Sequence, residues 1–260
     1  MLLEERKGVI RKEFFLCGHN LVIECKEGST YNIEKVENIS LCLARLLPNL
    51  KIESYFKAKP EVILNSDFVV TALNKETFTA VAVLCAKVFT CQQYYFLNIA
   101  TLLIGQNYQG TKLFNYLWKT LFQSILFIYP TFVDSITLKT YNPVSMSLLF
   151  KVGNRAKAGL YPNLENINET EVLFLEQIVE KLGIHEYLDK QRGIVYGGAV
   201  GVPTDFYPKL PAITDQRIIE MFAPPLSPSD RILGCIFMLE NHQKLALLKQ
   251  FGISFDVKQK

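Results

Sequence analysis

The sequence contains little that would mark a metal centre, a redox dithiol or a nucleic-acid-binding surface. Its six cysteines form no C-x-x-C pair, and its three histidines show no H-x-x-x-H spacing, which disfavours a zinc site or a redox dithiol. Lys and Arg number 28 against 25 Asp and Glu, and a net charge of +3 is too small for a protein that coats nucleic-acid phosphates. We therefore expect no metal and no nucleic-acid partner.

A targeting segment and a long uninterrupted apolar run are also missing. The first fifteen residues mix acidic and basic side chains, unlike the basic-then-apolar order of a secretory signal, so we expect a cytoplasmic protein whose scattered cysteines are buried thiols in a reducing compartment. The most tempting apolar stretch, 113–133, is interrupted by Asn115, Lys119, Gln123 and Pro130. This pattern favours a helix packed on a core over a membrane span.

What the sequence does contain is a group of strand-like runs in its first half. With 49% hydrophobic residues over 260 positions, the chain can bury a sizeable core. Residues 67–73, 78–89 and 94–103 are rich in Val, Phe, Tyr, Thr and Ile, and only four charged side chains occur between 67 and 103. We expect these runs to form an antiparallel meander at the centre of a sheet whose two faces are both covered.

A polar loop with two glycines follows the third run. It spans 104–112 and leads into a helix predicted at 111–125, then a strand at 135–140 and a helix at 144–152. This alternation is typical of an α/β fold. Because the first N–H groups of a helix lack acceptors within the helix, a loop of this kind has anion-binding potential, and Gly110 would allow close approach of the backbone.

The flanking regions are less distinctive. Apolar residues at three- and four-residue steps (Val36, Ile39, Leu43 and Leu47) predict an amphipathic helix within 31–50, which Pro48 would end. Further elements are predicted as strands at 21–25, 194–200 and 232–239 and as helices at 168–182 and 240–251. The proline-rich stretch between the two later strands is interpreted as a long ordered excursion or a flexible lid.

Two local segments carry a family resemblance. I-G-Q-N-Y-Q-G-T-K-L-F, from Ile104, resembles the pyrophosphate loop of the GNAT acyltransferase superfamily, with matches at Gln109 and Gly110. N-P-V-S-M-S-L-L-F-K-V-G resembles the segment after the fifth strand of that family, with matches at Asn142, Leu148, Lys151 and Gly153. The two segments and the strands between them cover about a third of the chain.

The resemblance implies a GNAT-like acyl-CoA N-acyltransferase fold, α/β in class, with a mixed, mostly antiparallel central sheet flanked by helices and a C-terminal extension. It implies that acyl-coenzyme A, carrying an acetyl or longer chain, is the co-substrate and that a small-molecule or peptide amine is the acceptor. The residues expected to bind the cofactor are Leu102, Leu103, Ile104, Gln109, Gly110, Thr111, Lys112 and Asn142.

The sequence departs from the family at its catalytic positions. Leu149 stands where many members have a tyrosine that protonates the departing thiolate, and Asn98 stands near the position of a glutamate base. Attack by a neutral amine on a thioester mainly needs positioning and carbonyl polarisation, so catalysis is still expected. Tyr141 and Asn98 are the candidate catalytic residues, and Tyr207 and Asp205 are further candidate acid or base groups.

We expect residues 1–155 to form the GNAT-like core, with the acyl-CoA-binding segment at 67–153, and residues 156–260 to complete the sheet and supply a substrate lid. Two alternatives to an acyl-CoA-dependent enzyme stay open. The first is an acyl-amino-acid or acyl-homoserine-lactone-synthase-like enzyme that takes its acyl group from an acyl carrier protein. The second is a GNAT-fold binding module without catalysis.

Overall fold

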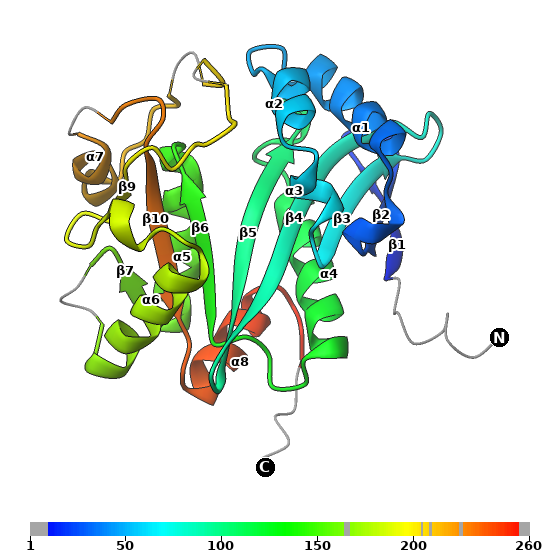
Figure 1. Cartoon of the computed structure of the whole chain (residues 1–260). Helices are drawn as coiled ribbons and strands as arrows, with labels where there is room; N and C mark the ends of the chain where they lie inside the picture. The colour runs from blue at the N-terminus through cyan, green and yellow to red at the C-terminus, as the bar shows by residue number, and fades with distance from the viewer. Residues whose placement is uncertain (1–9, 164–166, 204, 208–209, 224–225, 255–260) are drawn as a thin grey trace. The chain divides into compact units, whose positions relative to one another are not determined.

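The computed structural model describes residues 10–163, 167–203, 205–207, 210–223 and 226–254. The chain divides into two compact units (Figure 1), one formed from 1–87, 100–132 and 251–260 and the other from 88–99 and 133–250. Strands β4 (Ala80–Cys91) and β5 (Tyr94–Ile104) have residues in both units. Three prolines of the proline-rich excursion, at 208, 224 and 225, and the first nine residues lie outside the described ranges.

The first unit is built on strands in the order β1-β2-β3-β4, each antiparallel to the next. The bounds of the first three are β1 Arg11–Leu16, β2 His19–Lys26 and β3 Phe68–Asn74. Almost every side chain of β3, and of β4 as far as Ala86, is buried. The scarcity of charge in these runs correctly predicted that both faces are covered.

Four helices complete the first unit: α1 Ile33–Leu46, α2 Ile52–Ala58, α3 Glu61–Leu64 and α4 Leu113–Ile128. Helix α4 packs on β2 and β3 through a buried face that includes Leu117, Leu121 and Ile125, while α1 and α2 pack against each other (Figure 1). The apolar stretch at 113–133 is thus a core-packed helix, as predicted. Within the described ranges, no helix has the length and apolar character needed to cross a membrane.

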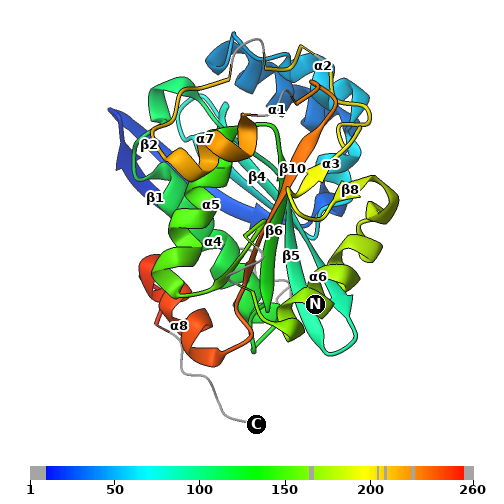
Figure 2. The same ribbon diagram turned by 90° about the vertical axis from the view of Figure 1, so that its left-hand side faces the viewer.

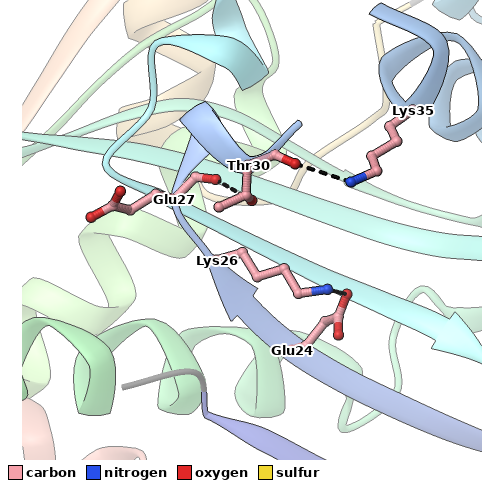
Figure 3. A network of polar contacts seen from close by, with 5 residues as sticks. All are labelled: Glu24, Lys26, Glu27, Thr30 and Lys35. Carbon is pink, nitrogen blue, oxygen red and sulfur yellow. Dashed lines mark hydrogen bonds and ion pairs between the residues drawn. The ribbon is translucent and has the colours of Figure 1, made fainter. Parts of the chain in front are cut away.

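Short polar contacts fix the chain between β2 and α1 (Figure 3). Lys26 Nζ lies 2.6 Å from Glu24 Oε1, and the Thr30 hydroxyl donates to the Glu27 carbonyl at 2.7 Å. Lys35, in the first turn of α1, donates to the Thr30 carbonyl at 3.1 Å. The ammonium groups therefore satisfy a carboxylate and a turn carbonyl within the first unit, which gives this cluster a structural role.

The second unit has strands in the order β5-β6-β10-β9-β8, and β7 also pairs with β10. Strand β5 is parallel to β6, whereas the other pairings recorded in this unit are antiparallel. The bounds are β6 Ser135–Thr140, β7 Gly159–Tyr161, β8 Leu188–Asp189, β9 Ile194–Val195 and β10 Arg231–Phe237. A mixed, mostly antiparallel sheet flanked by helices is therefore confirmed.

The helices of the second unit are α5 Pro143–Ala156, α6 Glu169–Lys181, α7 Gln216–Phe222 and α8 Asn241–Gln250. Side chains of β10 alternate between two of them. Leu233, Cys235 and Phe237 join the core formed by α6, whereas a Cβ at Gly234 would meet Met146 and Leu149 of α5 within 3 Å. Helices α5 and α6 therefore cover opposite faces of β10, and α8 packs beside α5 (Figure 2).

Three expectations are wrong in detail. The strand predicted from residue 78 begins at Ala80, because the Asn74 side chain accepts from the N–H groups of residues 76 and 77 and leaves Phe78 in the turn at φ +55°. The strand predicted over 194–200 ends at Val195, because Gly197 takes a positive φ of +63° in a turn. The cysteines are not all buried, since Cys17 is exposed and Cys42 is half-buried.

Candidate functional site

The predicted anion-binding loop lies entirely in the first unit. β5 ends at Ile104, Gly105 donates its N–H to the Val81 carbonyl at 2.9 Å, and a single 3₁₀ turn follows at Gln106–Tyr108. Leu102 and Ile104 are half-buried and Leu103 is buried. The loop therefore starts from a well-packed strand end and reaches α4 within eight residues.

The main-chain N–H groups between this turn and α4 are the chemical feature of the loop. The N–H of Gln109 donates to the Gln106 carbonyl at 3.2 Å, so it is used within the turn. Of the N–H groups that follow, that of Leu113 donates to the Thr111 hydroxyl at 3.2 Å. The described residues provide no acceptor for the N–H groups of Gly110, Thr111, Lys112, Phe114 and Asn115.

Side chains hold the loop in shape without filling it. The Gln109 amide donates back to the Ile104 carbonyl at 2.9 Å, and the Thr111 hydroxyl donates to the Tyr108 carbonyl at 2.6 Å. Gly110 has a φ of +72°, and a Cβ built on it would meet no atom within 4 Å. The space in front of this turn is therefore open, and the turn has a conformation that favours glycine.

The side chains of Lys112 and Phe114, at the start of α4, have different surroundings. Lys112 is exposed and forms the N-cap of α4 with no side-chain cap. The Phe114 ring lies 5.8 Å from the Trp118 ring, one turn further along the helix. The N-terminal end of α4 combines the positive end of the helix dipole with a mobile ammonium group, which together favour an anion.

The hairpin turn between β1 and β2 contacts the same loop. Cys17 Sγ lies 3.7 Å from the Asn107 carbonyl, and the His19 ring lies 6.3 Å from the Tyr108 ring. Sequence reasoning missed this contact, because Cys17 and Asn107 are 90 residues apart. The hairpin supports the 3₁₀ turn from outside.

In the second unit, Asn142 caps α5 directly after β6. Its Oδ1 accepts from the N–H of Val144 at 2.9 Å, and its own N–H donates to the Thr140 hydroxyl at 2.9 Å. Pro143 occupies the first position of the helix, where a missing N–H has no cost. The motif residue Asn142 therefore has a structural role as the N-cap of α5, and any contact with a ligand would be in addition to this role.

Tyr207, from the proline-rich segment, packs on this junction. The Asn142 side chain is close to the Tyr207 hydroxyl, and a hydrogen bond from it favours the ionised form of the phenol. Burial raises the pKa of the Tyr207 hydroxyl, while the Asn142 hydrogen bond and the charge of Arg231 oppose this rise. Tyr207 therefore keeps its proton at neutral pH.

Tyr141 is held in the same cluster. Its ring lies 6.3 Å from that of Tyr207, and the Arg231 guanidinium lies 5.4 Å from the centre of the Tyr141 ring, a cation–π geometry. The Tyr141 hydroxyl donates to the Leu226 carbonyl at 3.4 Å. Arg231 is buried and was missed from the sequence, because no local pattern connects position 231 with Tyr141.

The remaining catalytic candidates lie elsewhere. Asn98, on β5, pairs with Thr137 of β6 and accepts from its hydroxyl at 3.2 Å. Leu149 is buried against β10, and Asp205 is exposed. Among the residues that the structure describes, no cluster of three His, Cys, Asp or Glu side chains could hold a metal ion.

The parallel ladder between β5 and β6 is short. It runs from Phe96↔Ser135 to Ile99↔Leu138, all within the second unit. The rest of β5, Ala100–Ile104, belongs to the first unit and leads into the loop.

No protein-family model and no curated protein matches the chain. In fold it is similar to several solved N-acetyltransferases. These include the GNAT-family N-acetyltransferase YhbS of Escherichia coli in complex with CoA (TM-score 0.38, 12% identity, 54% of this chain and 75% of that one). They also include the catalytic domain of the Tetrahymena GCN5 histone acetyltransferase in complex with coenzyme A (0.36, 12%, 50% and 74%). A third is the ribosomal-protein-S5-alanine acetyltransferase of Vibrio fischeri (0.36, 12%, 55% and 81%).

The chemistry of the site follows from this chain's own residues.

Proposed function

We propose that this protein is an acyltransferase that transfers the acyl group of an acyl-coenzyme A to an amine. The observation that carries the proposal is the row of main-chain N–H groups at Gly110–Lys112, ahead of α4, for which the described residues offer no acceptor. Such groups bind the oxygens of a diphosphate well, because they are fixed donors at the positive end of a helix. The resemblance of this loop to the GNAT pyrophosphate loop points to the same ligand.

The residues that the resemblance implies for the cofactor are assigned here for each unit by itself. In the first unit we assign the diphosphate to Gln109, Gly110, Thr111 and Lys112, with Leu102, Leu103 and Ile104 beside the cofactor arm. The Ile104 carbonyl accepts from the Gln109 side chain, so that Gln109 acts by shaping the turn. Asn142, in the second unit, is the residue that the resemblance implies for contact with the cofactor arm.

We further propose that Tyr207 performs the role of the tyrosine that many members of the resembling family have at the position of Leu149. The amine nitrogen attacks the thioester carbonyl, the C–N bond forms and the C–S bond breaks, and the Tyr207 hydroxyl donates its proton to the departing sulfur. The proton lost by the amine restores the phenol. The raised pKa of Tyr207 suits a group that has to stay protonated at neutral pH.

Tyr141 and Asn98 then have positioning roles. Tyr141 packs beside Tyr207 and under the Arg231 guanidinium, and so fixes the surroundings of the phenol. Asn98 is an amide that accepts from Thr137 and takes no proton at neutral pH. The scheme therefore requires an acceptor amine that is already neutral when it binds.

The experiment is a coupled assay on the full chain. Release of free thiol from acetyl-, butyryl- and octanoyl-CoA is measured with and without a panel of small amines and peptides with free amino termini. Thiol release that depends on the amine, with the acylated product seen by mass spectrometry, supports the proposal. Absence of CoA binding by calorimetry contradicts it.

A binding module without catalysis is the second candidate, because Leu149 and Asn98 replace residues that are catalytic in the resembling family. Tight CoA binding without turnover across the amine panel would favour it. The same assay with an acylated carrier protein as the donor tests the remaining alternative, which no observation in the described residues favours.

A further inference from the structure

A cavity of about 300 Å³ lies in the second unit, and neither Asn142 nor Tyr207 lines it. Its apolar part is formed by Phe150 of α5, Leu160 of β7, Pro162 and Met221 of α7. This volume equals that of roughly ten water molecules in the liquid. It lies at the lower end of the range for small-molecule pockets, about 300–1,000 Å³.

The polar rim of the cavity carries two arginines from different elements. Arg192 comes from the turn between β8 and β9, and Arg217 comes from the first turn of α7. Asn163, Gln191 and Glu220 complete the rim. The lining therefore carries two guanidinium groups and one carboxylate.

Each of the two arginines forms an ion pair with a nearby aspartate that uses only part of its N–H donors. Arg217 Nη2 lies 3.4 Å from Asp215 Oδ2, and Arg192 Nη1 lies 4.0 Å from Asp189 Oδ2. Each recorded pair uses one nitrogen of a guanidinium that has five N–H donors. The two aspartates also serve the backbone, since Asp215 caps α7 and Asp189 accepts from the N–H groups of the turn that carries Arg192.

We propose that this cavity binds an organic carboxylate with a short apolar tail. A planar guanidinium group can donate two parallel hydrogen bonds to a carboxylate, and the apolar lining of Phe150, Leu160, Pro162 and Met221 suits a short hydrocarbon chain. A carboxylate is favoured over a phosphate because Glu220 on the same rim repels a doubly charged anion. This site is independent of the proposed acyl transfer.

The test is calorimetric titration of the full chain with octanoate, with octan-1-amine and with inorganic phosphate. We expect 1:1 binding of octanoate and no binding of the amine or of phosphate. Arg192→Gln and Arg217→Gln should each weaken octanoate binding about tenfold or more, the loss of one charge-assisted hydrogen bond. Arg155→Gln is the matched control, because Arg155 is exposed on α5 of the same unit and does not line the cavity.

A second variant fills the cavity instead of changing its charge. Met221→Trp, at a half-buried position on α7, should abolish octanoate binding while circular dichroism of the chain stays unchanged. Absence of octanoate binding to the unmodified chain overturns the proposal. Equal binding of octan-1-amine, displacement by phosphate, or undiminished binding by the double arginine variant also overturns it.

Discussion

Replacement of Gly110 by alanine separates the conformational role of this residue from its role in ligand binding. Gly110 has a φ of +72° and open space around its missing Cβ, so the substitution produces no clash in the free protein. Its cost is that of a left-handed backbone for an L-residue, about 1–2 kcal/mol. For a chain of this size, that corresponds to a fall in Tm of about 2–4 °C per kcal/mol.

Gly183 provides the control. It follows α6 in the second unit, has a φ of +65°, is exposed and also has no atom within 4 Å of an added Cβ. Gly183→Ala should therefore lower Tm by about as much as Gly110→Ala. Differential scanning fluorimetry of the two variants measures this conformational cost.

The two variants should differ in their affinity for CoA. At Gly110, the added methyl group enters the space in front of the N–H groups, so the loss of about one charge-assisted hydrogen bond should raise the Kd for CoA about tenfold, which is about 1.4 kcal/mol. At Gly183 the Kd should not change. Equal Kd values for both variants and the unmodified chain, measured by calorimetry, would refute the assignment of the diphosphate to this loop.

Three further predictions concern single side chains. Tyr207→Phe should lower kcat about 100-fold. Because the pKa of Tyr207 is raised and the protonated phenol is the active form, the activity of the unmodified enzyme should fall with rising pH only above about 10, the ordinary tyrosine value. If the variant shows the same fall in activity, Tyr207 is not the acid. Asp134→Ala should cost about 3–5 kcal/mol of unfolding free energy in urea, since it leaves the buried Lys244 without the carboxylate 2.6 Å away, and a loss below 1 kcal/mol would contradict this account. In the native protein at pH 8, the exposed Cys17 should react quickly with a thiol reagent. Cys25 should not react, because burial raises the pKa of its thiol to about 11. Rapid labelling of Cys25 would contradict its burial.

The sequence was most informative where one physical requirement dominates. Strands that are buried on both faces can carry almost no charge, and this scarcity of charge marked β3 and β4, and also the partly buried β5, with errors of one or two residues. The helix after the loop and the strand Ser135–Thr140 were found for similar reasons, because an amphipathic pattern and a β-branched run are local signals.

Other elements could not be predicted because tertiary contacts define them. Strand β1, with the sequence RKEFFL, is mostly exposed and forms by pairing with β2. Strand β7 has only three residues and was missed, and the strand predicted over 194–200 shrinks to the two residues of β9 because a glycine turn begins there. None of these has a periodic pattern long enough to be read.

The candidate site was predictable in part for the same reason. Gln109, Gly110 and Asn142 stand in local motifs, and the structure places them at the loop before α4 and at the N-cap of α5. The hydrogen bond of Tyr207 to Asn142 and the position of Arg231 over Tyr141 join segments 65 or more residues apart in the sequence, which no local pattern records.

The most direct test of the central claim is an NMR titration of the ¹⁵N-labelled full chain with CoA, observing the amide resonances of the loop. Hydrogen bonding of main-chain N–H groups to a diphosphate should shift the amide protons of Gly110, Thr111 and Lys112 in a saturable way, while the amide of Gly183 stays in place. If CoA binds and these three resonances do not move, or if CoA does not bind at all, the claim that this loop holds the diphosphate is wrong.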